Sequence, residues 1–286
     1  MSLEFAKMHG LGNDFMVVDL VSQSATVDEA RIRAWSDRHT GVGFDQLLLI
    51  EPPSDPDADF RYRIFNADGG EVEQCGNGAR CAARYVAHRQ LSPKTTLILQ
   101  TQCGPIVTRL LDAGMVEVDM GEPRTGPGAI PFDPQADGSA RPCDDGAASR
   151  YELQIAAGTW QFTPVSIGNP HAVLFVDSIA NAPVATVGAA LVGHAVFPEG
   201  ANIGFCEVVD RGFLRLRVFE RGVGETRACG TGACAAVVAA HLQGKVGDRV
   251  KVSLPGGKVR ISWQGPGSTL KMTGPTALVF EGKIEL

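Results

Sequence analysis

The sequence predicts a mixed α/β fold of the α+β type, built as two pseudo-symmetric lobes from an internal duplication. Three segments of the first half recur in the second half in the same order. FNADGGEVEQCGNGA at 65–79 aligns with FERGVGETRACGTGA at 219–233, LGNDFMVV at 11–18 with IGNPHAVL at 167–174, and QLLLIE at 46–51 with NIGFCE at 202–207. We therefore expect each lobe to be a curved, mainly antiparallel sheet around a central helix, with the active site in the cleft between the lobes.

Runs rich in β-branched and alternating apolar residues predict the strands. They are 60–65, 95–100, 105–111 and 115–120 in the first half, and 151–156, 171–176, 202–209, 213–219, 249–254, 258–263 and 277–280 in the second. The T-x-x-E pattern from Thr26 to Glu29 predicts a capping box that opens a helix through about His39.

Two further helices are predicted to follow the repeated Cys-Gly motifs, and another lies near 182–193. The helix after Cys75 places its apolar residues on one face, namely Ala79, Ala82, Ala83 and Val86. The helix at 231–242 contains ACAAVVAA and is apolar all round, as expected of a helix buried at the centre of a lobe.

Residues 121–150 are rich in Pro, Gly, Asp and Ala, and five prolines argue against regular structure there. The predicted organisation is an N-terminal lobe at 1–125, a Pro/Gly-rich loop at 126–150, a C-terminal lobe at 151–270 and a final strand at 271–286 that could return to the first lobe.

Composition narrows the class of partner. The chain has 286 residues, 44% of them hydrophobic and 20% charged, and a formal net charge of -6. These values give no electrostatic reason to expect nucleic acid or a membrane surface as a partner. The N-terminus lacks an apolar signal region and no uncharged apolar run has membrane-spanning length, so we expect a cytoplasmic protein.

The seven cysteines do not form a CxxC pair and should be reduced thiols. Cys103 and Cys206 lie in strand-like runs, whereas Cys81 and Cys234 lie in apolar helical stretches. We interpret these four as small buried hydrophobic residues. The sequence suggests no role for Cys143.

The remaining two cysteines stand immediately before Gly-x-Gly and a helix. First-turn amides have no partner inside the helix and favour anions, so Gly76 and Asn77, like Gly230 and Thr231, could bind a carboxylate. The same field should lower the thiol pKa of Cys75 or Cys229. A thiolate and a thiol on opposite faces of a planar intermediate would invert an α-carbon. The alternative is a tight turn with a small Cys packed beneath it.

These motifs resemble the diaminopimelate epimerases over essentially the whole chain: HGLGNDF, FDQ, IFNADG, QCGNGARC, IGNPHAV, ANIGF, FERGVGETRACGTGAC and MTGPTALVF. The resemblance implies cofactor-free interconversion of L,L- and meso-2,6-diaminopimelate, for lysine and cell-wall precursors, by a homodimer without a metal. It implies that Cys75 and Cys229 are the acid–base pair, with His171 and Glu220 nearby to help set thiol protonation. The substrate-contacting positions it implies are Asn13, Gln46, Asn66, Asn169, Asn202, Glu220 and Arg221, with Gly76, Asn77, Gly230 and Thr231 holding the reacting carboxylate.

Several alternatives stay open. Arg221 offers a fork for a carboxylate and Glu220 can accept from an ammonium, but the pair could equally be a solvated charge cluster. The asparagines and Gln46 could be turn residues, and His171 a satisfied surface histidine. A proline or hydroxyproline racemase would also use paired cysteines. A non-catalytic redox or zinc protein, with Cys229-x4-Cys234 as ligands, is the rival from another class. No PLP, flavin or nucleotide motif is visible.

Overall fold

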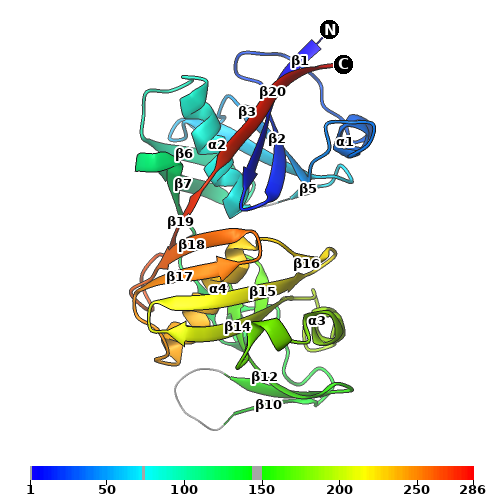
Figure 1. Ribbon diagram of the computed structural model, residues 1–286, viewed down its shortest axis with the longest axis vertical. Coiled ribbons are helices and arrows are strands. Elements are labelled where there is room, and N and C mark those ends of the chain that lie inside the picture. Colours follow the sequence, from blue (N-terminus) through cyan, green and yellow to red (C-terminus); the bar gives the residue numbers. More distant parts are fainter. Residues whose placement is uncertain (1, 73–74, 144–149) are drawn as a thin grey trace. The chain divides into compact units, whose positions relative to one another are not determined.

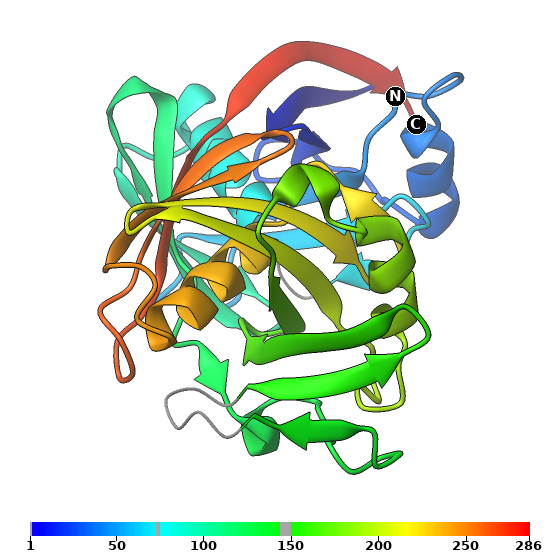
Figure 2. The same ribbon diagram turned by 60° about the horizontal axis from the view of Figure 1, so that its bottom comes forward.

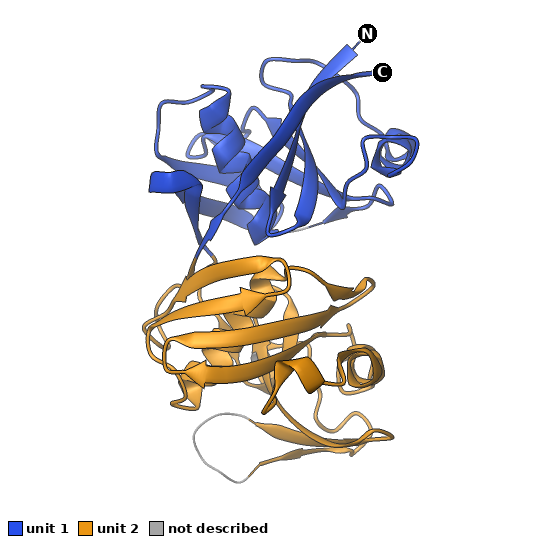
Figure 3. Cartoon of the chain, in the orientation of Figure 1, with its two compact units in different colours: residues 1–119, 273–286 blue, residues 120–272 orange. Residues whose placement is uncertain are grey.

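The computed structural model describes residues 2–72, 75–143 and 150–286, and its contacts divide the chain into two units (Figure 3). Unit 1 comprises residues 1–119 and 273–286, and unit 2 comprises residues 120–272. The last strand of the chain therefore belongs with the first residues, because β20 (Ala277–Glu285) pairs antiparallel with β1 (Ser2–Gly10).

The elements of both units follow in chain order (Figure 1). Those of unit 1 are β1, β2 (Asn13–Asp19), α1 (Glu29–Ser36), β3 (Gln46–Glu51), β4 (Phe60–Asn66), β5 (Glu71–Val72), α2 (Gly76–His88), β6 (Thr96–Thr101), β7 (Gly104–Leu110), η1 (Asp112–Gly114), β8 (Met115–Asp119) and β20. Those of unit 2 are β9 (Arg124–Thr125), η2 (Pro127–Ala129), β10 (Ala140–Pro142), β11 (Tyr151–Ile155), β12 (Gly158–Ser166), β13 (Pro170–Phe175), η3 (Ile179–Asn181), α3 (Val184–Val192), β14 (Asn202–Asp210), β15 (Phe213–Glu220), β16 (Gly224–Thr226), α4 (Gly230–Leu242), β17 (Arg249–Leu254) and β18 (Gly257–Ser262). The boundary falls inside β19 (Lys271–Pro275).

The strand pairings of the two units repeat each other. In unit 1, β2 pairs parallel with β3, β3 antiparallel with β4, β4 parallel with β6, and β6 antiparallel with β7. In unit 2, β13, β14, β15, β17 and β18 pair in the same order and the same senses. The repeated pairing confirms the predicted duplicated α+β fold.

Each sheet curves around one helix (Figures 1 and 2). Helix α2 contacts strands β1, β2, β3, β4, β7 and β8, and helix α4 contacts β12, β13, β14, β15, β17 and β18. The small apolar side chains predicted for these helices are buried, including Ala79, Ala82 and Ala83 in α2 and the ACAAVVAA run in α4. Alanine-rich faces let strands approach the helix axis closely from several sides.

Two predictions about unit 1 are wrong in detail. Helix α1 begins at Glu29, and its N-cap is Asp28, whose carboxylate accepts the amide of Arg31 at 2.9 Å. The predicted capping box at Thr26 therefore does not form, and the helix ends at Ser36 rather than near His39. Cys103 is exposed rather than buried, because it lies in the two-residue turn between β6 and β7.

The segment after Met120 is more ordered than its prolines predict. Strand β9 pairs with β12, and β10 pairs with β11. Phe132 is buried, with its ring centroid 4.7 Å from that of Tyr151 and 5.6 Å from that of Phe162. The amide of Cys143 donates to the carbonyl of Arg150 at 2.9 Å, while residues 144–149 of the predicted loop lie outside the described residues.

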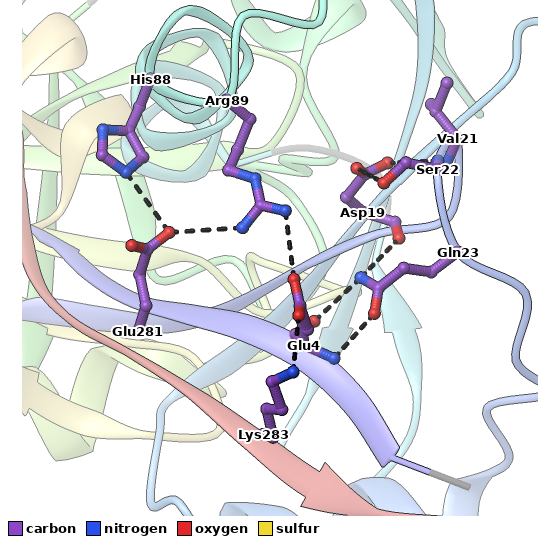
Figure 4. Close-up of polar contacts among 9 residues, drawn as sticks. All are labelled: Glu4, Asp19, Val21, Ser22, Gln23, His88, Arg89, Glu281 and Lys283. Atoms are coloured by element: carbon purple, nitrogen blue, oxygen red, sulfur yellow. Dashed lines mark hydrogen bonds and ion pairs between the residues drawn. The ribbon is translucent and has the colours of Figure 1, made fainter.

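A polar network fastens β20 to β1 and to the end of α2 (Figure 4). The Glu4 carboxylate lies 3.2 Å from Arg89 and 3.0 Å from Lys283, and Arg89 also reaches Glu281 at 3.5 Å. The side chain of Gln23 accepts the Glu4 amide at 2.7 Å and donates back to the Glu4 carbonyl at 3.1 Å. The network holds β20 in register beside β1.

We predict that Gly78→Ala lowers the free energy of unfolding by about 1–3 kcal/mol, because overpacking forces neighbours to move. A Cβ on Gly78 would lie 2.1 Å from the hydroxyl oxygen of Tyr62, a residue that is 1% exposed. Urea denaturation of the single variants and of Gly78→Ala with Tyr62→Phe measures the coupling. The double variant should be less destabilised than the sum of the single effects, since Phe lacks the clashing oxygen. Strict additivity would contradict the packing argument.

Candidate active site

The start of α2 holds the first of the two repeated cysteines. Cys75 is the N-cap residue in an extended conformation, and its Sγ accepts the amide of Gly78 at 3.4 Å. The cysteine thus takes the place that Ser, Thr, Asp or Asn usually occupies at a helix start. Its sulfur is fixed at the end of the helix where the macrodipole is positive.

A chain of amides lies beside Cys75. Its Sγ is 3.9 Å from Oδ1 of Asn13, which also accepts from Nδ2 of Asn77 at 3.2 Å. The fully buried guanidinium of Arg80 donates to Oδ1 of Asn77 at 2.7 Å. Nδ2 of Asn13 donates to the carboxylate of Asp45 at 3.1 Å. The Asn13 side chain is therefore oriented with its oxygen toward the thiol.

Gln46 and Asn66, also predicted to contact substrate, face each other across β3 and β4. Nε2 of Gln46 donates to Oδ1 of Asn66 at 2.9 Å. The pair leaves the Gln46 oxygen and the Asn66 amide nitrogen as the ends that could meet an amino-acid head group.

A cluster of charged side chains surrounds Asp14, the residue that follows Asn13. Arg38 donates to both carboxylate oxygens of Asp14 at 3.0 and 2.8 Å, and Lys7 lies 2.5 Å from the same carboxylate. Arg38 also reaches Asp45 at 2.7 Å. Burial raises the pKa of Asp14, but the hydrogen bonds from Arg38 and Lys7 outweigh it and hold the pKa well below its usual range.

The start of α4 in unit 2 has the same construction. Cys229 is the N-cap residue, and its Sγ accepts the amide of Gly232 at 3.4 Å. The hydroxyl of Thr231 lies 3.6 Å from the sulfur. Cys229 is 5% exposed, whereas Cys75 is only half-buried.

The expected lowering of the thiol pKa does not hold at Cys229. Burial, followed by the charge of Glu220, raises the pKa of Cys229 well above its ordinary value, although hydrogen bonds from Thr231 and Gly232 act in the opposite direction. Glu220 also accepts a hydrogen bond from the Cys229 thiol and another from Thr226. The carboxylate therefore favours the protonated thiol.

His171 lies in the interior, which excludes the reading as a surface histidine. It is 1% exposed, and its Nε2 lies 3.0 Å from Oδ1 of Asn169. Nδ2 of Asn169 donates to Oγ1 of Thr231 at 3.4 Å. Burial lowers the pKa of His171 to about 3, so the imidazole is neutral at physiological pH.

Asn202 and Arg221 meet at the end of β15. Oδ1 of Asn202 accepts the backbone amide of Arg221 at 2.9 Å, and the Arg221 guanidinium donates to the carbonyl of Glu199. A Cβ on Gly200 would lie 2.9 Å from Cδ of Arg221, and Gly200 has a φ of +70°. The glycine turn thus lets the arginine stem lie against the backbone.

Sequence reasoning missed the charged and aromatic supports of these residues. Tyr62 donates to the carbonyl of Cys75 at 3.3 Å, Arg80 fixes Asn77, and Asp45 fixes Asn13. Arg38 joins Asp45 to Asp14. The charged residues inside the GND and GNGAR motifs could have indicated these supports, because a charge that is buried in the fold requires a partner.

Within residues 2–72, 75–143 and 150–286, no group of three or more His, Cys, Asp or Glu side chains could hold a metal ion. No helix in these ranges is long and apolar enough to cross a membrane. Cys234, the second member of the possible zinc pair, is fully buried inside α4.

Comparison with known sequences gives one consistent result. The profile of the family described as diaminopimelate epimerase matches residues 5–126 and 163–279. Diaminopimelate epimerases of Ectopseudomonas mendocina and of Pseudomonas aeruginosa strain UCBPP-PA14 are 53% and 52% identical to this chain over 286 residues, covering 100% of both partners in each comparison.

Solved structures share the fold at low sequence identity. A hydroxyproline epimerase from Agrobacterium vitis superposes with a TM-score of 0.70 at 17% identity, covering 99% of this chain and 92% of the other. A predicted epimerase from Pseudomonas aeruginosa gives a TM-score of 0.67 at 16% identity, covering 99% of each chain. These likenesses support the duplicated fold alone.

We predict that Asp14→Asn lowers the free energy of unfolding by about 1–3 kcal/mol near neutral pH, because Lys7 and Arg38 lose their partner. The folded-state pKa of Asp14 lies below its unfolded value of about 3.9, so its contribution is present above that value and is lost as the pH falls. Urea denaturation between pH 7 and pH 2.5 should show the gap between wild type and variant narrowing below about pH 4. A gap that stays constant with pH would refute the assignment.

Proposed function

The chain belongs to the diaminopimelate epimerase family, and from this premise we propose that it interconverts L,L- and meso-2,6-diaminopimelate by passing a proton between two cysteines. One observation carries the proposal. Each unit places a cysteine as the N-cap of its central helix, with the sulfur held by the amide three residues later. A duplicated thiol site suits a reaction that needs an acid and a base of the same kind.

The proposed chemistry balances without a cofactor. One cysteine, as thiolate, removes the proton from the α-carbon and becomes a thiol. The other cysteine, as thiol, donates its proton to the opposite face of the planar carbanion and becomes a thiolate. The α-carbon is inverted, and the enzyme is left ready for the reverse reaction.

Both helix starts suit the charge that develops on the substrate. First-turn amides and the helix dipole stabilise a carboxylate and the enolate-like intermediate derived from it. We assign that role to Gly76 and Asn77 on α2 and to Gly230 and Thr231 on α4. Glu220, hydrogen-bonded to Cys229, would keep this thiol protonated until substrate arrives.

Amide side chains and Arg221 support a substrate with a second amino-acid head. We assign contacts with the substrate, including this distal head, to Asn13, Gln46, Asn66, Asn169, Asn202 and Arg221. A cyclic imino acid has no distal head group and would therefore offer these polar side chains no partner in the bound state. This disfavours proline or hydroxyproline as substrate.

The outer strand of unit 1 supports a homodimer. Among the described pairings, β20 has β1 as its neighbour, and three consecutive apolar side chains on it are exposed: Leu278, Val279 and Phe280. An edge strand with such side chains is a ready surface for a second strand. A second copy of the chain, presenting the same strand about a twofold axis, would cover both patches.

The cysteines support a reducing compartment. The sequence contains no CxxC pair, and Cys103 is exposed. An exposed thiol is compatible with the cytoplasm, where thiols stay reduced. We therefore place the reaction in the cytoplasm.

The first prediction of the proposal concerns solvent protons. Epimerisation of L,L-diaminopimelate in D2O should give meso product with deuterium at one α-carbon, because the donating thiol exchanges with solvent before it protonates the carbanion. Cys75→Ala and Cys229→Ala should each lower turnover by at least about 10²- to 10⁴-fold. Proton NMR with chiral analysis measures both quantities.

Cys103→Ala is the matched control, because this cysteine is exposed in the turn between β6 and β7 and is the N-cap of neither helix. L-Proline and L-lysine serve as comparison substrates. Epimerised product without deuterium would contradict the two-thiol mechanism. Near-normal turnover by Cys75→Ala or Cys229→Ala would contradict it as well. Preferred turnover of proline would transfer the assignment to an imino-acid racemase.

The second prediction concerns assembly. Val279 is 55% exposed on β20 and Val209 is 42% exposed on β14 of unit 2. Val279→Lys should weaken the dimer by placing a charge in its apolar contact, while Val209→Lys should leave it intact. Light scattering should report twice the chain mass of 30.2 kDa for wild type and control, and a shift toward 30.2 kDa for Val279→Lys. A monomeric wild type would contradict the proposed interface.

A further inference from the structure

The two central helices differ one turn inside their starts. In the alignment of GNGAR with GTGAC, Arg80 of α2 pairs with Cys234 of α4, and both side chains are 0% exposed. Burying a guanidinium costs free energy that burying a thiol does not. Helix α4 packs among the equivalent strands with a cysteine at this position, so the repeated fold does not require the charge. The guanidinium in α2 therefore points to a role in the site rather than in the packing.

Arg80 lies against the end of β1. Its Nη2 donates to Oδ1 of Asn77 at 2.7 Å. A Cβ on Gly10, the last residue of β1, would lie 3.2 Å from this Nη2 and 3.5 Å from Cβ of Asn77. The glycine thus leaves the room that the guanidinium and Asn77 occupy, and the HGLGND and GNGAR motifs meet at this contact.

The guanidinium sets the direction of the hydrogen bonds beside it. Oδ1 of Asn77 faces Arg80, and Nδ2 of Asn77 donates to Oδ1 of Asn13 at 3.2 Å. Nδ2 of Asn13 in turn donates to the carboxylate of Asp45 at 3.1 Å. A guanidinium can only donate and a carboxylate can only accept, so the two amides between them have one orientation. Such a chain of hydrogen bonds is also polarised along its length.

The start of α4 is built differently. The residue paired with Asn77 is Thr231, whose hydroxyl can donate as well as accept, and the carboxylate of Glu220 lies near its N-cap. The start of α2 instead has an oriented amide with a positive charge behind it. Negative charge on a bound carboxylate, which grows as the proton leaves the α-carbon, is therefore better stabilised at α2 than at α4.

We propose that Arg80 is a positioning residue, which acts through Asn77 to make the start of α2 the principal site for the carboxylate on the reacting carbon. The inference rests on the proposed reaction. With its oxygen turned inward to the guanidinium, Asn77 offers N–H groups to the substrate. Arg80 itself is fully buried and does not touch the substrate.

Variants of the full chain separate a hydrogen-bond donor from a side chain that only fills space. Arg80→Met keeps the aliphatic stem and removes the donor, whereas Arg80→Lys keeps a charged donor and loses the guanidinium shape. Gly10→Ala leaves Arg80 in place and forces its guanidinium to shift, because the added Cβ would lie 3.2 Å from Nη2. Cys234→Ala, at the paired position of α4, is the matched control.

The first measurement needs no substrate. The side-chain amide signals of Asn77 and Asn13 in proton–nitrogen NMR spectra report the chain of hydrogen bonds, and Asn77→Ala and Asn13→Ala identify them by their loss. Arg80→Met and Gly10→Ala should shift both pairs of signals. Arg80→Lys should shift them less, since a donor again faces Oδ1 of Asn77, and Cys234→Ala should leave both pairs in place.

The second measurement is turnover of L,L-diaminopimelate. Arg80→Met should lower kcat about tenfold or more, the effect of losing one hydrogen bond to a charged group. KM should change less, because the carboxylate carries more negative charge in the transition state than in the bound substrate. Arg80→Lys should recover most of the loss, Gly10→Ala should lower kcat about threefold, and Cys234→Ala should turn over as wild type does.

A packing role predicts the opposite order, with Met a better replacement than Lys, and that order would overturn the proposal. Wild-type kcat in Arg80→Met would overturn it too, whether or not the amide signals move. If Arg80→Met does not fold, unshifted signals or wild-type kcat in Gly10→Ala has the same effect. Signals that move as expected in a chain that fails to epimerise diaminopimelate would keep the orientation of Asn77 by Arg80 and remove the proposed reaction.

Discussion

The hydrogen bond from a helix amide to a cysteine sulfur is the interaction on which both halves of the protein depend. It fixes the residue at which α2 and α4 begin, because Sγ of Cys75 and of Cys229 each engages the amide of the glycine three residues later. Those glycines are in turn constrained by the core, where a Cβ at Gly232 would lie 3.0 Å from Val218. The position of each sulfur is thus set by the packing of a buried helix, which is stiffer than a surface loop.

Duplication supplied two equivalent positions, and later substitutions made their surroundings chemically different. Cys75 is half-buried and faces an amide oxygen supported by the buried Arg80. Cys229 is buried and lies between a carboxylate and a hydroxyl. A symmetric pair would have equal proton affinities, so neither group would be predisposed to hold the proton. Different partners give each thiol its own resting state while the backbone geometry stays shared.

Periodicity and self-similarity were sufficient to predict most of the fold. The alternation in FRYRIF predicted β4, whose residues Phe60, Tyr62 and Ile64 are buried, and the repeat predicted that both halves share one topology. The sequence did not predict which of several suitable residues caps a helix or which residue lies in a turn. Asp28 caps α1 although Thr26 could have done so, and Cys103 is exposed because it lies in the turn before Gly104, which has a φ of +111°, rather than in a strand. The orientation of the Asn169 amide could not be predicted either, because it depends on how the His171 side chain lies in the folded structure.

The return of β20 to β1 has a consequence for synthesis on the ribosome. Residues 120–272 form a contiguous unit that can fold once they have left the exit tunnel. The first unit is discontinuous, since β20 is translated only after the whole of the second unit. Nascent chains therefore carry the N-terminal sheet with β1 unpaired on one side until β20 has been synthesised. A truncated message would yield a folded second half attached to an incomplete first half, which exposes a strand edge to aggregation or to proteolysis.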